Sequence, residues 1–221
     1  MGTSLLKIIH IEPSSRCTLA CPQCPRTEYI ARISPEDCAI DVLANACKNF
    51  DAVIMCGNHG DPIYHSDFHG LIRAIRNSNP HISMRIVTNG AFRSQAWWQT
   101  TAELLDSARD SLTFSIDGLP SNNHSYRVNS KWSTIETAIR TLSSLNPNLL
   151  LIWKWIVFRY NERDISSGID LAAELGIKKF IMVSSVRYEQ DHWLTPSKSY
   201  DEIKQETLEW YQSLRAVNKA Q

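Results

Sequence analysis

The chain has 221 residues, and its 23 basic and 23 acidic side chains leave no formal net charge, which gives no long-range reason to expect nucleic acid or an anionic membrane as a partner. No apolar run reaches the roughly 20 residues that cross a bilayer, and residues 1–7 lack the apolar core of a signal peptide. We therefore expect a cytoplasmic protein with one domain over residues 1–221, large enough to bury its own core.

Apolar, β-branched runs alternate with amphipathic stretches along the whole chain. The runs predict strands at residues 7–11, 52–56, 83–87, 111–116, 149–158 and 179–183. The amphipathic stretches predict helices at residues 35–49, 67–77, 94–108, 134–145, 165–175 and 200–217. Ser34 and Pro35 suit the start of the first helix, and Gly176 suits the end of the fifth.

Six such units predict an α/β protein with a parallel sheet and right-handed crossovers. The sheet is either a partial (β/α)6 TIM-like barrel or an open, doubly wound sheet. In both arrangements ligands bind at the carboxyl ends of the strands. Chemically reactive side chains follow five of the predicted strands, at residues 12–24, 57–62, 88–90, 117–118 and 161.

Three cysteines lie close together after the first strand. Cys17, Cys21 and Cys24 have the spacing C-x3-C-x2-C, and three thiolates on one short loop can bind three irons of a [4Fe-4S] cluster while the fourth iron stays open. The alternative is zinc, which in structural sites takes four ligands, commonly as two pairs. No second close pair follows, and His10, a possible fourth ligand, lies in the first strand, so the spacing favours the cluster.

The other three cysteines are expected to be structural. A reducing compartment argues against disulfides in spite of the even count. Cys38 and Cys47 fall inside the first predicted helix and are expected to pack, and Cys56 is expected to be buried at the end of the second strand. No cysteine follows Cys56, so a second cluster is not expected.

The segment Glu12-Pro13-Ser14-Ser15-Arg16, the cysteines and Pro25-Arg26 resemble the radical SAM superfamily, in particular its peptide-modifying and molybdenum-cofactor-type branch. Many members of the family carry a cysteine-rich C-terminal extension, which is not expected here because no cysteine follows Cys56. The likeness extends over essentially the whole chain and implies a partial barrel. It also implies that S-adenosylmethionine (SAM) chelates the open iron, that an external donor such as flavodoxin or ferredoxin supplies an electron, and that a 5′-deoxyadenosyl radical abstracts hydrogen from an unknown substrate.

The resemblance implies further SAM-binding residues. Gly57, Gly60, Asp61 and Pro62 stand where the family has a Gly-x-Gly-Glu-Pro segment that holds the SAM ammonium, and aspartate shortens the reach by one methylene. Thr88 and Asn89 match a third-strand motif near the methionyl portion. The alternatives are a glycine-rich turn and an ordinary Asn-Gly turn.

Ser115 and Asp117 end the fourth strand, and alternation places them on one face. By the resemblance, they bind the SAM carboxylate and ribose, Arg127 pairs with the carboxylate through a forked contact, and Asn161 lies near the ribose. The alternatives are a surface arginine for Arg127 and a helix cap for Asn161.

Three functions are compatible with these features. The first is a radical SAM enzyme that acts on a peptide or another polymer. The second is a small-molecule radical SAM enzyme of the deazapurine-synthase type. The third is a non-catalytic iron–sulfur or zinc binding module on a degenerate barrel. Formation of 5′-deoxyadenosine distinguishes the two enzymes from the module.

Overall fold

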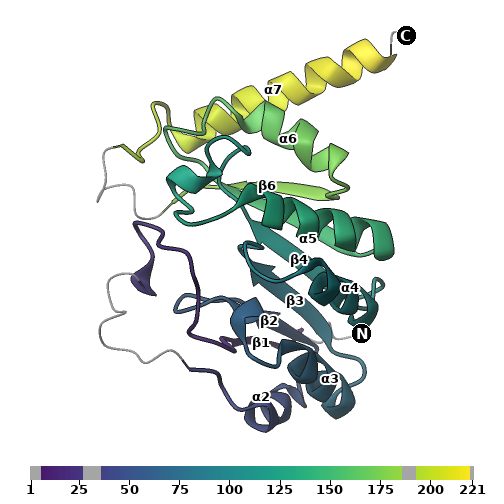
Figure 1. Cartoon of the computed structure of the whole chain (residues 1–221). Helices are drawn as coiled ribbons and strands as arrows, with labels where there is room; N and C mark the ends of the chain where they lie inside the picture. The colour runs from purple at the N-terminus through teal and green to yellow at the C-terminus, as the bar shows by residue number, and fades with distance from the viewer. Residues whose placement is uncertain (1–5, 27–35, 186–192, 220–221) are drawn as a thin grey trace.

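The computed structural model describes residues 6–26, 36–185 and 193–219 (Figure 1). Six parallel strands form one sheet in the order of the sequence. They are β1 (Ile8–Ile11), β2 (Ala52–Met55), β3 (Ser83–Thr88), β4 (Ser111–Ser115), β5 (Leu150–Ile156) and β6 (Lys179–Val183).

Helices connect the strands, and a last helix follows β6. They are α2 (Ile40–Cys47), α3 (Phe68–Ser78), α4 (Gln95–Leu104), α5 (Trp132–Leu145), α6 (Ile165–Glu174) and α7 (Tyr200–Lys219), with short 3₁₀ turns η2 (Pro62–Tyr64) and η3 (Asn123–Ser125). The predicted α/β class is confirmed: the strands alternate with helices in an open sheet, as in a partial TIM-like barrel. Among the described helices, none is long and apolar enough to cross a membrane.

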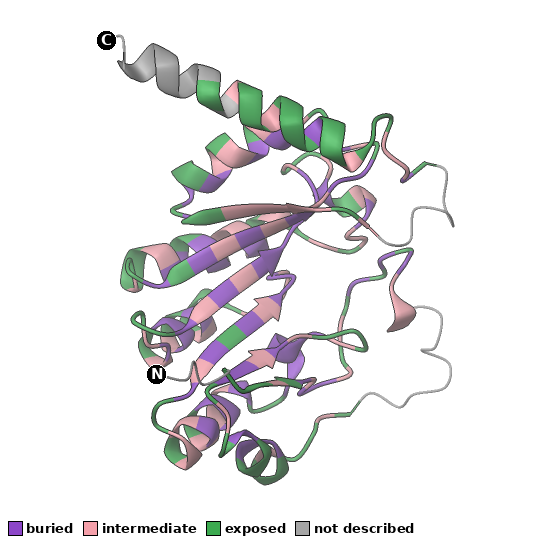
Figure 2. Ribbon diagram, turned by 180° about the vertical axis from the view of Figure 1, so that it is seen from behind, coloured by how far each residue is buried: buried purple, intermediate pink, exposed green. Residues whose placement is uncertain are grey.

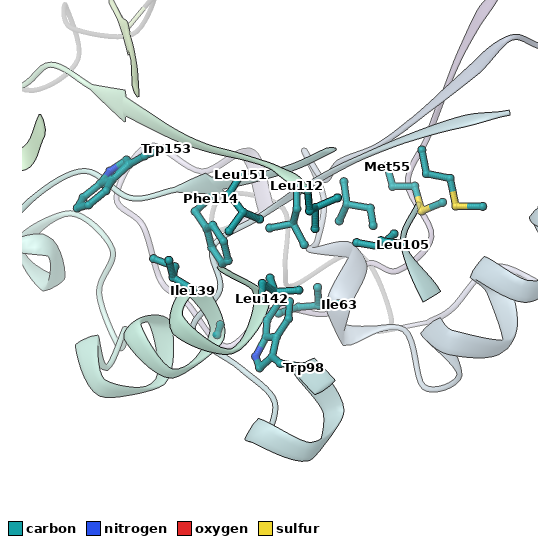
Figure 3. Packing of buried hydrophobic residues seen from close by; sticks show 14 of the residues in the cluster. Met55, Ile63, Trp98, Leu105, Leu112, Phe114, Ile139, Leu142, Leu151 and Trp153 are labelled. Carbon is teal, nitrogen blue, oxygen red and sulfur yellow. The ribbon is translucent and has the colours of Figure 1, made fainter. Parts of the chain in front are cut away.

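A row of apolar side chains across the sheet holds the helices against it. Met55, Ile86, Leu112 and Leu151 are partners in register on four neighbouring strands, and each is at most 1% exposed. Figure 3 shows the helix-side cluster to which these residues belong. Burial of one such side chain stabilises the fold by about 1.5–3 kcal/mol, and a slip of one residue would turn the row to the opposite face. The row therefore fixes the register that aligns the ends of the strands.

The first predicted helix is shorter than expected. It begins at Ile40 instead of residue 35, because residues 36–38 bond to the segment before the cysteines: Ser15 N donates to Glu36 O and Cys38 N donates to Pro13 O. The expected start at Ser34 and Pro35 lies outside the described residues.

Two expectations for single cysteines were wrong in part. Cys47 is buried on α2, as expected, but Cys38 precedes the helix and is exposed. Cys56 lies just after β2 and is only half-buried, with its Sγ 2.6 Å from Nε2 of His10.

Candidate functional site

A pocket of about 190 Å³ lies at the carboxyl ends of the strands. It contains the three cysteines of the predicted cluster and seven of the ten residues predicted to bind SAM, namely Gly57, Gly60, Asp61, Thr88, Asn89, Ser115 and Arg127. Pro62, Asp117 and Asn161 do not line it. Six further residues do: Leu19, Arg26, Cys56, Asn58, Val87 and Lys154. Residues from four strand ends and the cysteine loop thus meet at one place.

The cysteine loop presents three thiols to this pocket. Cys21 is buried, and Cys17 and Cys24 are half-buried. Asn89 Nδ2 lies 3.5 Å from Cys17 Sγ, and Arg127 Nη1 lies 3.9 Å from Cys21 Sγ, so these two sulfurs each have a nitrogen donor beside them. Burial raises the pKa of Cys17 to about 12. The positive charge of bound iron would therefore be needed to hold the Cys17 sulfur as a thiolate.

These residues fit an iron–sulfur cluster. Soft thiolates are the usual protein ligands of such clusters, and hydrogen bonds to the sulfurs tune their potentials. Among the described residues, no three His, Cys, Asp or Glu side chains lie close enough to hold one metal ion together. A cubane does not require such a group, because each thiolate binds a different iron.

The glycine segment after β2 packs directly on the chain that leads to the cysteines. A Cβ atom on Gly60 would lie 2.0 Å from the carbonyl oxygen of Ser14, and Asp61 N donates to Arg16 O at 2.9 Å. The Glu12 carboxylate accepts hydrogen bonds from Asn58 Nδ2 and His59 N. The absence of side chains at the glycines therefore allows the two loops to touch, backbone against backbone.

Asp61 is buried, and the protein itself satisfies its carboxylate. It accepts hydrogen bonds from Thr88 Oγ1, from both nitrogens of Asn89, and from Ile63 N. Burial raises the pKa of Asp61 to about 6, although the hydrogen bonds from Asn89, Thr88 and Ile63 act in the opposite direction. The carboxylate thus joins the end of β2 to the end of β3 and orients Asn89 in the pocket.

Asp117 lies behind Arg127, outside the pocket. Its Oδ2 accepts a hydrogen bond from Arg127 Nε at 2.7 Å, and its Oδ1 accepts one from Ile156 N at 2.7 Å. Burial raises the pKa of Asp117, while the charge of Arg127 opposes this shift. Burial by itself would lower the pKa of Arg127, but Asp117 and Cys21 hold it above the ordinary value. Of the two residues of this ion pair, Arg127 is therefore the one whose charge reaches the pocket.

Asn161 is fully buried and braces the loop after β5. Its side chain donates to the carbonyl oxygens of Asp117 and Ile156 and accepts from Phe158 N, at 2.8–2.9 Å. These bonds use both its donor and its acceptor sides. In this structure Asn161 ties the ends of β4 and β5 together.

Sequence reasoning did not find Lys154 or Cys56 as pocket residues. Lys154 pairs in register with Ser115 on the neighbouring strand and so shares its face, a relationship that the apolar run of residues 149–158 does not reveal by itself. Cys56 is the first residue after β2 and lines the same pocket. Its position beside Gly57 was the available signal.

Comparison with known proteins identifies the family. The family model described as the radical SAM superfamily matches residues 11–192 of this chain. A search of curated proteins found no match.

Several solved structures have the same fold. SuiB from Streptococcus suis bound to S-adenosylmethionine has a TM-score of 0.71 at 16% identity, over 96% of this chain and 49% of that one. SuiB bound to the precursor peptide SuiA gives 0.70 at 16% identity, over 96% and 47%. Native anSMEcpe with bound AdoMet gives 0.64 at 16% identity, over 81% and 51%. This chain thus spans about half the length of the structures it matches.

Proposed function

This chain belongs to the radical SAM superfamily, and from that membership we propose that it is an enzyme that holds a [4Fe-4S] cluster through Cys17, Cys21 and Cys24 and cleaves SAM reductively. One observation carries the proposal. The three thiols share a single pocket with seven of the residues that the sequence pattern assigns to SAM. When bound, the cluster supplies the electron that breaks the sulfonium bond of SAM, and the released 5′-deoxyadenosyl group abstracts hydrogen from the substrate.

The residues of the chain bind and orient SAM in this proposal. Arg127 provides a forked cation for the SAM carboxylate, and Asp117 fixes the direction of its guanidinium through the bond to Nε. Asn89 and Ser115 offer polar groups from β3 and β4. Asp61 acts indirectly, because its carboxylate is already bonded to Thr88 and Asn89.

For the substrate we propose a peptide, and for the electron source an external donor such as flavodoxin or ferredoxin. The support for a peptide is that SuiB and anSMEcpe, which share this fold, have been solved with the peptides SuiA and Cp18Cys. We also propose a reducing compartment, the cytoplasm, because the cysteines in the described part of the chain form no disulfide.

The test is formation of 5′-deoxyadenosine. Protein reconstituted with iron and sulfide without oxygen is reduced with dithionite and incubated with SAM, and the product is quantified by mass spectrometry. We expect slow release without substrate and none from the Cys24→Ala variant. A protein with an intact, reduced cluster that forms no 5′-deoxyadenosine, with or without candidate peptides, would instead be a non-catalytic binding module.

A further inference from the structure

The six strands carry charge of one sign. They contain no aspartate or glutamate, and their titratable side chains are His10, Arg85, Lys154 and Lys179. This imbalance is local, because the chain as a whole is neutral. Each strand residue of a partial barrel faces either the helices or the opposite side. The face on which these four side chains lie therefore decides whether their charge can act on a ligand.

All four lie on the face of the sheet that points away from the helices. His10 and Arg85 are both in register with Ile54, Lys154 is in register with Ser115, and Lys179 with Ile152. Their strand neighbours pack on the helix side, as Trp153 and Trp155 do on either side of Lys154. Figure 2 shows the strands from this side, with helices α4 and α5 behind them. The open face is therefore a basic wall that leads to the pocket.

Lys154 is the member of this wall that lines the pocket. In the described part of the chain, its ammonium makes no hydrogen bond or ion pair. The two nearby carboxylates are already engaged, Asp117 by Arg127 and Ile156 N, and Asp61 by Thr88 and Asn89. Burial and the charge of Arg127 lower the pKa of Lys154, and Asp117 and Cys56 act in the opposite direction. A bound anion would supply a counter-charge in direct contact with the ammonium, which the described residues do not provide.

The proposed function assigns another cation, Arg127, to the SAM carboxylate. Arg127 lies beside the cysteine loop, with Nη1 3.9 Å from Cys21 Sγ. Lys154 lies near the carboxyl end of β5, on a different element from Arg127, and interacts electrostatically with Arg127, Asp117 and Cys56.

Three cations line this pocket, Arg26, Arg127 and Lys154. Arg26 donates to Leu19 O and Arg127 to Asp117. The side chain of Lys154 alone of the three makes no hydrogen bond or ion pair within the described residues, so it suits an anionic group that is not on SAM.

We propose that Lys154 binds an anionic group of the substrate, a carboxylate or a phosphate, on the open face of the sheet. The substrate then enters along the basic wall and places its anion at Lys154, beside the SAM pocket. This inference rests on the proposed function and narrows its substrate to an acidic one, a peptide with a carboxylate or phosphorylated side chain.

The experiment measures protection of Lys154 from chemical labelling. Anaerobically reconstituted protein is trace-labelled with acetic anhydride, and peptide mass spectrometry compares Lys154 with exposed Lys48 as internal reference. The probes are inorganic phosphate and acetate, with acetamide as the neutral control, up to about 100 mM, the range for millimolar affinity. In a second readout, phosphate or acetate is added to the wild type and to Lys154→Met during thermal unfolding.

We expect saturable protection of Lys154, approaching about tenfold when the anion is at ten times its Kd, with Lys48 unchanged, and an anion-dependent rise in Tm in the wild type only. Protection by phosphate alone would indicate a phosphorylated substrate, and protection by acetate a carboxylate. Equal labelling with all probes, an equal rise in Tm in Lys154→Met, or protection by SAM but not by the anions would overturn the proposal. Neither readout needs SAM cleavage, so a chain that protects Lys154 but forms no 5′-deoxyadenosine would overturn the proposed function alone.

Discussion

Asp117 and Arg127 form a buried ion pair, with Oδ2 of Asp117 2.7 Å from Nε of Arg127 and the Asp117 side chain fully buried. The sequence pattern places the two residues at different parts of SAM, the ribose and the carboxylate. The geometry instead makes Asp117 the support of Arg127, because both oxygens of its carboxylate are bonded within the protein. Asp117 thus affects a ligand in the pocket only indirectly, by orienting the guanidinium of Arg127.

The Asp117→Ala variant tests this arrangement. We expect SAM to bind about ten- to a hundredfold more weakly, the equivalent of losing one charged hydrogen bond of about 1.5–3 kcal/mol. Removing one partner of a buried pair also lowers the free energy of unfolding by about 3–5 kcal/mol. Isothermal titration of the folded, reconstituted protein measures the affinity. Unchanged SAM affinity would show that Arg127 does not depend on Asp117.

The control is an exposed ion pair elsewhere on the surface. Asp106 and Arg109 lie 2.7 Å apart with side chains about one-third exposed. Exposed pairs contribute little to stability. Asp106→Ala is therefore expected to leave SAM affinity unchanged.

Cluster stoichiometry provides a second prediction. Because the described cysteines offer one three-thiol loop at the pocket, reconstituted protein should contain about four irons and four sulfides per chain. Colorimetric iron and sulfide assays measure this. Iron near eight, or stoichiometric zinc in protein purified without oxygen, would contradict the single cluster.

The cysteines should differ in what their loss does. Cys17→Ala, Cys21→Ala and Cys24→Ala are each expected to lose the intact cluster, whereas Cys38→Ala and Cys47→Ala keep it. Cys38 is exposed and Cys47 is buried on α2, away from the pocket. The charge-transfer absorption of the reconstituted variants reports the cluster. A folded Cys47→Ala protein without a cluster would mean that the ligands are wrongly assigned.

The sequence predicts those parts of the fold that depend on contacts between residues close together in the chain. Strand positions follow from apolar runs, and the predicted strands agree with the structure to within two residues. The start of α2 could not be predicted, because residues 36–38 bond to residues 13–15 across the sequence. The helical periodicity of this stretch does not indicate that residues 13–15 compete for its backbone hydrogen bonds.

The candidate site shows the same division. The three cysteines lie close to one another in the sequence, and so do the two glycines, so each motif can be recognised from the sequence. The burial of Asp61 and Asn161 cannot be predicted in this way, because it depends on Thr88 and Asp117, which lie 27 and 44 residues away. Lys154 stands in a long apolar run, and its face becomes evident only from its register with Ser115.

Asp61 should make stability depend on pH. Its pKa is about 6 in the folded chain, above the ordinary 3.8, through burial. The folded state thus holds this proton at pH values where the unfolded state has lost it. The contribution of Asp61 is therefore fully present below about pH 4 and is lost as the pH rises to about 6, a fall of about 3 kcal/mol in the free energy of unfolding.

Urea unfolding of the cluster-free chain between about pH 4 and 7 measures this fall. Asp61→Asn is the matched variant, because it keeps the size of the side chain and removes its titration. Its unfolding free energy should be lower throughout, since an amide cannot accept all the hydrogen bonds of the carboxylate, but should lack this pH-dependent component. The same pH dependence in both proteins would place the titration on another group.

The contact between Gly60 and Ser14 leads to the last prediction. A methyl group on Gly60 would lie 2.0 Å from Ser14 O and 2.7 Å from Ser15 Cα, both backbone atoms. Neither atom can turn aside as a side chain can, and Asp61 N holds the loops together through Arg16 O. Gly60→Ala must therefore push the glycine segment away from the chain that leads to the first cysteine.

We expect Gly60→Ala to lower the free energy of unfolding by about 1–3 kcal/mol, the usual effect of overpacking, and to reduce both cluster content and SAM affinity in the protein that folds. Asn58→Ala is the control: Asn58 is exposed in the same segment and loses one hydrogen bond to Glu12, which costs about 1 kcal/mol or less. Urea unfolding and iron content per folded chain separate the two variants. Wild-type stability and iron content in Gly60→Ala would show that the glycine segment does not lie against Ser14, and the shared pocket of cysteines and SAM-binding residues would lose its structural basis.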